Sequence, residues 1–280
     1  MILVTGATGN VGREVIKLLL EGGEKMAGVT RSPATAALPE GVHVVSGDAS
    51  RPASLAPALG AVSAVLISPR AVGDAAAELV ALAAERGAER VVLLSAATVE
   101  FGGGERRFAD GFAAAEDAVM ASGLPWTCLR CSDFAGNSLA WAPQIRAAGV
   151  VRGAYGDAAT SPVDERDVAA VAARALVDPD HAGRRYVLTG PESLTQRDKV
   201  RLIGEALGRE LVWEEFPPQR VREAMIAQGH PEDVPDRLLG YLADRAETPG
   251  PSSDTVATVL GRPARTFAAW AADHAEAFRD

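Results

Sequence analysis

Cysteine and long apolar runs are both scarce in this sequence of 280 residues. Its only cysteines are Cys128 and Cys131, which excludes a secreted scaffold held together by disulfides. No apolar run approaches the roughly 18 residues that a membrane-spanning helix needs. The N-terminal sequence MILVTGATGNVG lacks the regions of a signal peptide. We therefore expect a soluble cytoplasmic protein without a membrane partner.

Basic residues are also in deficit, with 28 Lys and Arg against 37 Asp and Glu and a formal net charge of −9. An acidic surface repels phosphate backbones, so no nucleic-acid partner is expected. The four histidines show no metal-ligand spacing, and there is no G-x-S-x-G turn. The sequence therefore predicts neither a metal site nor a serine hydrolase.

The first half of the chain alternates short apolar runs with longer helical patterns. Strands are expected at 2–5, 25–30, 42–46, 62–67, 90–95 and 126–130, and helices at 11–20, 74–86 and 105–121. Such alternation implies right-handed βαβ units and a parallel sheet covered on both faces. We therefore expect an α/β fold, a doubly wound parallel sheet of the Rossmann type with a smaller mixed α/β C-terminal subdomain.

The second half has a more mixed pattern. Asp164 has the features of an N-cap, and Thr195-Gln-Arg-Asp198 resembles a capping box. Further expectations are strands at 186–188 and 211–214, loops at 217–218 and 249–253, and a closing amphipathic helix at 265–278. We predict a dinucleotide-binding domain over 1–150, to which 160–185 returns, and a smaller substrate-binding subdomain over 186–280.

A glycine-rich turn follows the first expected strand. Gly6-Ala7-Thr8-Gly9-Asn10-Val11-Gly12 has the spacing G-x-x-G-x-x-G, a variant of the Rossmann fingerprint. The early glycines let the backbone approach a pyrophosphate at the helix N-terminus, and Gly12 lets the helix pack closely on the strand. A purely structural turn is the alternative, which the position of the turn inside a βαβ series weakens.

The residues after the second and third strands bear on the choice of dinucleotide. An NAD-selective site usually has an acid at the end of the second strand, where this sequence has Val29-Thr30-Arg31-Ser32. Arg31 is placed to pair with a 2′-phosphate, so NADP(H) is favoured over NAD(H), with a solvated loop arginine as the alternative. Asp48 is either an acceptor for the adenine amino group or a surface turn, and we count it and Ala49 among the cofactor-binding candidates.

Two further segments end strands at the edge where doubly wound sheets bind ligands. Ile67-Ser68-Pro69 ends the fourth strand, and Ser95-Ala96-Ala97 ends the fifth. Both are therefore expected to line the cofactor site.

Six longer segments are similar, in combination, to one family. They are TGATGNVG, TRSP, GDAS, AAAEDAVMASGLPWTCLR, SPVDERDVAAVAARAL and YVLTGPESLT. The chain resembles the NmrA-like group of atypical short-chain dehydrogenases/reductases, which includes NADPH-dependent quinone and dye reductases and redox sensors that bind dinucleotide without turnover. The resemblance implies a Rossmann core, a small substrate-binding C-terminal region, and cofactor contacts at Thr5–Gly12, Arg31, Asp48, 67–70 (Ile67 to Arg70) and 95–97 (Ser95 to Ala97).

The chain departs from the wider family because it lacks the usual proton donor. Typical short-chain dehydrogenases carry Tyr-x-x-x-Lys on the helix after the fifth strand, with the tyrosine as proton donor. Here Phe108 and Phe112 have that spacing, and neither can donate a proton. Phe112 also occupies the position, four residues before Glu116, at which several NmrA-like reductases keep a lysine. The Tyr/Lys mechanism is therefore absent, and the catalytic residues are unknown.

Hydride transfer to a quinone or dye needs orientation and a dry pocket more than a protein acid. The candidates for lining such a pocket are Ser95, Phe108, Phe112, Cys131 and Phe134. For the three phenylalanines, an aromatic wall beside the nicotinamide competes with ordinary core packing.

Three other features carry weaker hypotheses. Cys128 and Cys131 have C-x-x-C spacing in an expected strand, which disfavours a redox dithiol because alternation sends them to opposite faces. Gly102-Gly103-Gly104 is either a mobile lid or a tolerated surface insertion. The acidic residues are interpreted as helix caps and solvated surface: Asp157, Asp164, Glu165 and Asp167.

These observations predict an NADP(H)-dependent oxidoreductase that transfers hydride to a small aromatic, quinone-like or enone/carbonyl substrate. The alternative is a non-catalytic NADP(H)-binding sensor that acts through a protein partner. A homodimer through apolar helices at 105–121 and 136–148 is an open possibility, because their pattern does not distinguish it from core packing.

Overall fold

The computed structural model describes residues 1–104 and 106–279. The chain divides into two compact units, each treated by itself below. The first unit comprises Met1–Val99, Asp110–Cys131 and Glu165–Val187. The second comprises Glu100–Ala109, Ser132–Asp164 and Leu188–Asp280.

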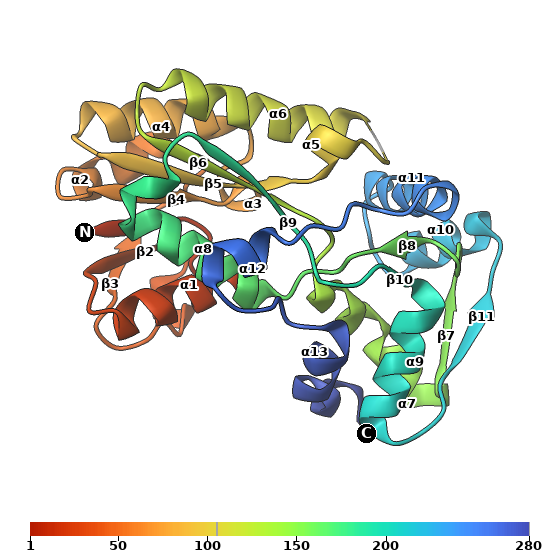
Figure 1. The fold of residues 1–280 in the computed structure, drawn as a ribbon. Coiled ribbons are helices and arrows are strands. Elements are labelled where there is room, and N and C mark those ends of the chain that lie inside the picture. Colours follow the sequence, from red (N-terminus) through yellow and green to blue (C-terminus); the bar gives the residue numbers. More distant parts are fainter. Residues whose placement is uncertain (105, 280) are drawn as a thin grey trace. The chain divides into compact units, whose positions relative to one another are not determined.

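A seven-stranded sheet with the order β3-β2-β1-β4-β5-β6-β9 forms the centre of the first unit (Figure 1). Its strands are β1 (Ile2–Val4), β2 (Met26–Thr30), β3 (His43–Ser46), β4 (Ala64–Ile67), β5 (Arg90–Ala96), β6 (Trp126–Cys131) and β9 (Arg184–Leu188). All five pairings among β1 to β6 are parallel. The strand order reverses between β1 and β4, the switch point at which doubly wound sheets bind ligands. The predicted α/β class is confirmed.

Helices cover both faces of this sheet, α4 and α6 on one face and α1 and α8 on the other (Figure 1). The helices of this part of the chain are α1 (Asn10–Glu21), α2 (Ala56–Leu59), α3 (Pro69–Val72), α4 (Ala76–Glu85), α5 (Thr98–Phe101), α6 (Arg106–Ala121) and α8 (Glu165–Val177). The helix expected at 74–86 begins with a 3₁₀ turn over Gly73–Ala75 before α4 starts.

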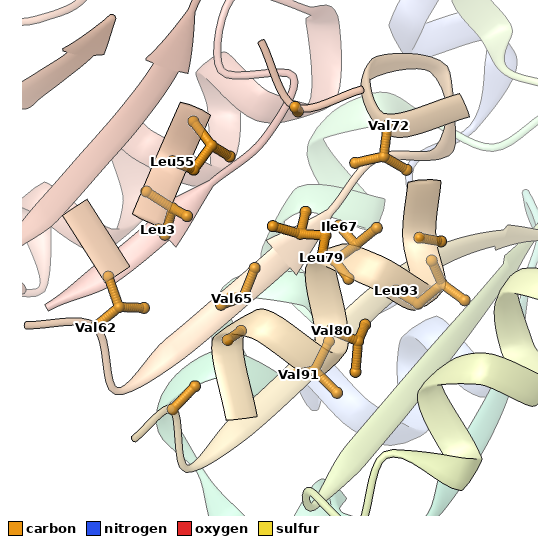
Figure 2. Close-up of a cluster of buried hydrophobic side chains, with 14 of the residues drawn as sticks. Leu3, Leu55, Val62, Val65, Ile67, Val72, Leu79, Val80, Val91 and Leu93 are labelled. Atoms are coloured by element: carbon orange, nitrogen blue, oxygen red, sulfur yellow. The ribbon is translucent and has the colours of Figure 1, made fainter. Parts of the chain in front are cut away.

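The apolar core of the first unit lies between the sheet and α4 (Figure 2). Val65, Ile67 and Leu93 point from the strands, and Leu79 and Val80 meet them from the helix. These side chains are almost fully buried. Each contributes on the order of 1.5–3 kcal/mol relative to exposure. The doubly covered strands are therefore apolar on both faces, as their sequences predict.

The second unit contains two small sheets and six helices among the described residues. The strand pairs are β7 (Val150–Gly153) with β11 (Val212–Glu215), parallel, and β8 (Ala159–Thr160) with β10 (Leu194–Thr195), antiparallel. The helices are α7 (Ala142–Ala148), α9 (Gln196–Leu207), α10 (Pro218–Ala227), α11 (Asp233–Glu247), α12 (Thr255–Leu260) and α13 (Phe267–Asp273). A separate core forms around Phe267, Trp270 and Phe278. No described helix has the length and apolarity to cross a bilayer.

Several local expectations need correction. The predicted loop at 217–218 is instead the start of α10, because Pro218 occupies the first helical turn, where its missing N–H costs nothing. The closing helix at 265–278 is shorter, since α13 ends at Asp273 and a 3₁₀ turn follows at Ala275–Phe278. The capping box is confirmed: Asp198 donates its N–H to Thr195 Oγ1 at 3.0 Å.

The acidic stretch before α8 is less exposed than expected. Asp164 and Asp167 are both buried, at 2% and 0% exposed, so the interpretation as solvated surface is wrong for these two residues. Both take part in polar interactions, which is the usual condition for a buried carboxylate.

Candidate functional site

Close backbone packing defines the glycine turn between β1 and α1. A Cβ on Gly12 would stand 2.2 Å from the carbonyl oxygen of Gly6, so only glycine fits there. Gly6 has φ +65, and a Cβ on it would lie 2.9 Å from Cβ of Ser68. Both positions therefore exclude side chains, and the spacing in the sequence reflects this geometry.

The N-terminus of α1 is open toward the turn. Gly9 is the N-cap in an extended conformation, no side chain caps the helix, and its first turn holds no acidic residue. Thr8, Gly9 and Asn10 are exposed, whereas Ala7 and Val11 are buried beneath them. The first N–H groups of a helix have no partner within the helix, and the helix dipole makes this end positive. Both properties favour the binding of a pyrophosphate. The residues present thus fit the dinucleotide that the sequence predicts.

Thr5 has a supporting role in this turn. Its buried hydroxyl donates to the Leu66 carbonyl at 2.9 Å and accepts the Ser68 N–H at 2.8 Å. Thr5 therefore joins the ends of β1 and β4. The hydroxyl therefore acts as a donor and as an acceptor within the protein, and Thr5 positions the turn.

Arg13 clamps the loop that follows β2. Its Nε donates to the Thr8 carbonyl at 3.0 Å, and its terminal nitrogens donate to the carbonyls of Ala36 and Ala37, each at 3.0 Å. These three bonds connect the glycine turn to the segment 33–37. This clamping role of Arg13 was not predicted from the sequence.

Arg31 and Asp48 lie at the ends of neighbouring strands β2 and β3. Arg31 is exposed and makes no hydrogen bond or ion pair within the described part of the chain. Asp48 Oδ1 accepts the hydroxyl of Ser50 at 2.7 Å and its N–H at 3.0 Å. These bonds, together with the charge of Arg31, hold the pKa of Asp48 below its usual value. The strand ends thus present an ionised acceptor and an uncommitted guanidinium.

The segments after β4 and β5 are partly enclosed. Ser68 precedes α3, which Pro69 begins, and Arg70 is exposed. Ala97 donates its N–H to the Cys131 carbonyl at 2.8 Å, so the chain after β5 stays joined to β6. The remaining alanines of the predicted cofactor set differ in burial: Ala49 is buried and Ala96 is half-buried.

Ser95 is committed to a buried ionic cluster. Its hydroxyl donates to Glu116 Oε1 at 2.6 Å, and Arg130 Nε donates to the same oxygen at 2.9 Å. Arg130 Nη2 meets Glu116 Oε2 at 2.6 Å, and Glu116 is 1% exposed. The Ser95 hydroxyl is therefore already engaged as a hydrogen-bond donor to a protein carboxylate. This cluster was missed, although a glutamate on an apolar helix face and an arginine inside a strand signalled it.

Both cysteines are buried free thiols. Desolvation raises the pKa of Cys131 to about 12, and the Cys131 Sγ lies 3.5 Å from the Leu129 carbonyl. Burial, aided by the charge of Glu116, also raises the pKa of Cys128 to about 12. Neither sulfur is a thiolate near neutral pH, so thiolate chemistry is disfavoured at both positions.

The three candidate phenylalanines do not share one unit. Phe112 belongs to the first unit and is half-buried. Phe108 and Phe134 belong to the second, where Phe108 is 36% exposed and Arg237 lies with its Cζ 4.5 Å from the ring centroid. The aromatic wall beside the nicotinamide stays a prediction.

The second unit holds a polar cluster that sequence reasoning missed. Lys199 Nζ lies 3.0 Å from Asp133 Oδ2 and 2.6 Å from Thr160 Oγ1, and Thr160 donates to the same carboxylate at 2.9 Å. Lys199 is 3% exposed. The described residues contain no group of His, Cys, Asp and Glu side chains that could hold a metal ion.

Comparison with known proteins agrees with this geometry. A family model described as NAD(P)H-binding matches residues 6–179. The chain is 42% identical over 281 residues to the (4-alkanoyl-5-oxo-2,5-dihydrofuran-3-yl)methyl phosphate reductase of Streptomyces griseus subsp. griseus, with 99% of both chains covered. It is 33% identical over 291 residues to the NAD(P)H azoreductase of Xenophilus azovorans, again with 99% of both covered.

Solved structures show the same fold. The NADPH-dependent quinone oxidoreductase of Escherichia coli, in complex with NADPH, superposes with a TM-score of 0.83 at 26% identity. The superposition covers 98% of this chain and 99% of that chain. These relatives fit the family resemblance drawn from the sequence, and the predicted oxidoreductase class is confirmed. The chain belongs to the NAD(P)H-binding family.

Proposed function

We propose that this protein is an NADPH-dependent reductase of a conjugated carbon–carbon double bond, of the kind found in an acyl-substituted unsaturated lactone. In this proposal the first unit binds the dinucleotide, and the second unit contributes to binding the substrate. The observation that carries the proposal is that neither Ser95 nor Cys131, the two pocket candidates of the first unit that bear a hydroxyl or a thiol, is free to give a proton to a substrate. The Ser95 hydroxyl donates its hydrogen bond to Glu116, and the buried Cys131 thiol stays protonated near neutral pH.

The preference for NADPH is supported by the end of β2. Arg31 is exposed and makes no ion pair with a described residue, so its guanidinium is available to a 2′-phosphate. An acid that would hold the ribose 2′-hydroxyl of NAD is absent from the sequence at 29–32. Asp48 keeps one carboxylate oxygen, Oδ2, without a hydrogen bond to any described residue, and this oxygen supports the predicted contact with the adenine amino group.

The substrate class follows from what a site without a positioned acid can do. NADPH, when bound, supplies a hydride. The compound in the name of the Streptomyces relative has a ring double bond conjugated to both a ketone and a lactone carbonyl. Addition of hydride at the far carbon of that bond leaves a negative charge spread over two carbonyl oxygens, and water can protonate such an anion. The protein then needs to orient the substrate and exclude competing reactions.

Consumption of NADPH with a matched pair of acceptors tests this proposal. We expect loss of absorbance at 340 nm with a 3-acyl-2-butenolide and none with the saturated 3-acyl-butyrolactone. An ordinary quinone serves as a second acceptor, because the quinone oxidoreductase relative is named for that activity. Consumption with quinones alone would overturn the substrate class and leave the reductase class intact.

A non-catalytic sensor is the second candidate. The observation that favours it is the pair of phenylalanines at 108 and 112 in place of the usual tyrosine and lysine. A sensor would bind NADPH and leave it unconsumed with every acceptor.

A further inference from the structure

One arginine of the second unit is buried and makes no hydrogen bond or ion pair with any described residue. Arg245, on α11, is 7% exposed, and its Nε is enclosed without any hydrogen bond. Its two terminal nitrogens also make no hydrogen bond or ion pair with a described residue. Because only Nε is among the enclosed unpartnered atoms, the terminal nitrogens reach solvent. A guanidinium in this position is buried on one side and open on the other.

Aromatic and glycine neighbours surround this guanidinium. Its Cζ lies 5.6 Å from the ring centroid of Tyr241, one turn earlier on α11. Nη2 lies 3.0 Å from the point where a Cβ on Gly103 would stand. Gly104 donates its N–H to Asp244 at 2.7 Å, so the three-glycine segment 102–104 packs on α11. The absence of side chains on that segment therefore lets its backbone pack closely against Arg245 and Tyr241.

No carboxylate of the described residues pairs with Arg245. Asp133 is close enough to act on the charge state of Tyr241, but its Oδ2 pairs with Lys199 at 3.0 Å and with Thr160, and its enclosed Oδ1 makes no hydrogen bond with a described residue. Asp244 is exposed and accepts from the Gly104 backbone. Among the described residues, Arg245 is therefore a buried cation without a hydrogen bond or an ion pair to a carboxylate. Burial of an unpaired charge is costly, and a fold that retains one usually satisfies it with a ligand.

We propose that Arg245 and the Tyr241 hydroxyl form an anion subsite that binds the phosphate monoester of the substrate. The inference rests on the proposed function, since it adds a phosphate to the conjugated lactone proposed above. A guanidinium presents two parallel N–H donors that match two phosphate oxygens. Burial raises the pKa of Tyr241, so its hydroxyl stays protonated and donates at neutral pH. In this proposal the segment 102–104, which the sequence leaves as either a mobile lid or a tolerated surface insertion, forms one wall of the subsite.

Binding is measured first, without turnover. With NADP⁺ saturating, inorganic phosphate is titrated against the unfolding temperature of the wild type, Arg245→Met and Arg201→Met. Arg201 is the charge-matched control, because it is exposed and already pairs with Asp198 and Glu205. We expect phosphate to raise the midpoint of the wild type and of Arg201→Met by about 2 °C or more, and to leave Arg245→Met unmoved.

The same experiment separates a binding role from a structural one. Without phosphate, Arg245→Met should unfold at the same temperature as the wild type or higher, because it removes a buried unpaired charge. A lower midpoint for Arg245→Met, with no phosphate effect on the wild type, would overturn the subsite.

Turnover gives the second measurement. Wild-type kcat/KM is compared for a phosphorylated hydroxymethyl butenolide and its free alcohol. We expect a preference of about tenfold to a hundredfold for the phosphate ester, lost in Arg245→Met and kept in Arg201→Met. No preference in the wild type would contradict the subsite and leave the reductase proposal standing. Phosphate binding that depends on Arg245, without reduction of either lactone, would contradict the reductase proposal alone.

Discussion

Gly12 lies against Gly6 so closely that a Cβ on Gly12 would stand 2.2 Å from the Gly6 carbonyl oxygen. This contact brings the first turn of α1 onto the end of β1 and opens the helix N-terminus toward the turn. Two residues six positions apart thus shape the turn at which we propose that the dinucleotide binds.

Gly12→Ala should therefore disrupt the turn, because its methyl group meets backbone atoms that cannot rotate away. We expect a loss of about 1–3 kcal/mol in the free energy of unfolding, and at least tenfold weaker NADPH binding by fluorescence titration. Gly60→Ala is the matched control, since nothing lies within 4 Å of a Cβ there and φ is −65. Equal NADPH affinity in the two variants would show that the turn does not hold the cofactor.

Arg31→Ala tests the choice of cofactor. Loss of a charged donor to a 2′-phosphate should weaken NADPH binding by about tenfold to a hundredfold and leave NADH binding unchanged. Arg51→Ala is the control, because Arg51 is also exposed and also lowers the pKa of Asp48 through its charge. Parallel losses of NADPH and NADH affinity in Arg31→Ala would contradict a role in selecting the phosphate.

The cluster of Ser95, Glu116 and Arg130 should behave as a buried ion pair. Glu116→Ala leaves the guanidinium of Arg130 without its main acceptor and should cost about 3–5 kcal/mol in urea unfolding. The double variant Glu116→Leu with Arg130→Met should recover most of that loss, because it removes both charges. A double variant with a lower free energy of unfolding than Glu116→Ala would contradict the view that the loss in Glu116→Ala comes from the unpaired charge of Arg130.

The two buried thiols predict a stability loss in alkali. Each pKa rises from 9.0 to about 12 in the native state, so the native protein holds protons that the unfolded chain releases. The free energy of unfolding should therefore fall as pH rises above about 9, and continue to fall toward 12. Cys128→Ala with Cys131→Ala should flatten this slope in urea unfolding between pH 8.5 and 10.5. An unchanged slope would show that other groups cause the fall in the free energy of unfolding at alkaline pH.

Local patterns predicted the parts of this structure that depend on nearby residues. The glycine turn and the capping box at Thr195 are each complete within a few residues, so spacing alone identifies them. Pairs that meet only through the fold escaped prediction. Lys199 and Asp133 are 66 positions apart, and Glu116 and Arg130 come from a helix and a strand.

Helix α11 was missed for another reason. Its sequence is strongly charged and contains a proline at 235, which suggests a break. Pro235 lies in the first turn, where no intrahelical N–H bond is lost, so the helix forms normally. Arg245 at its end makes no hydrogen bond with a described residue, which could not be recognised before the burial of this helix was known.

Isotope labelling of the product tests the central claim most directly. The protein is supplied with 4-deuterated NADPH, of each stereochemistry in turn, and a 3-acyl-2-butenolide in ordinary water, and the product is examined by NMR. One of the two labelled cofactors should place deuterium on the ring carbon farther from the acyl group, and a second run with unlabelled NADPH in heavy water should label the carbon between the carbonyls. Absence of cofactor-derived deuterium from the ring would contradict hydride transfer to the double bond.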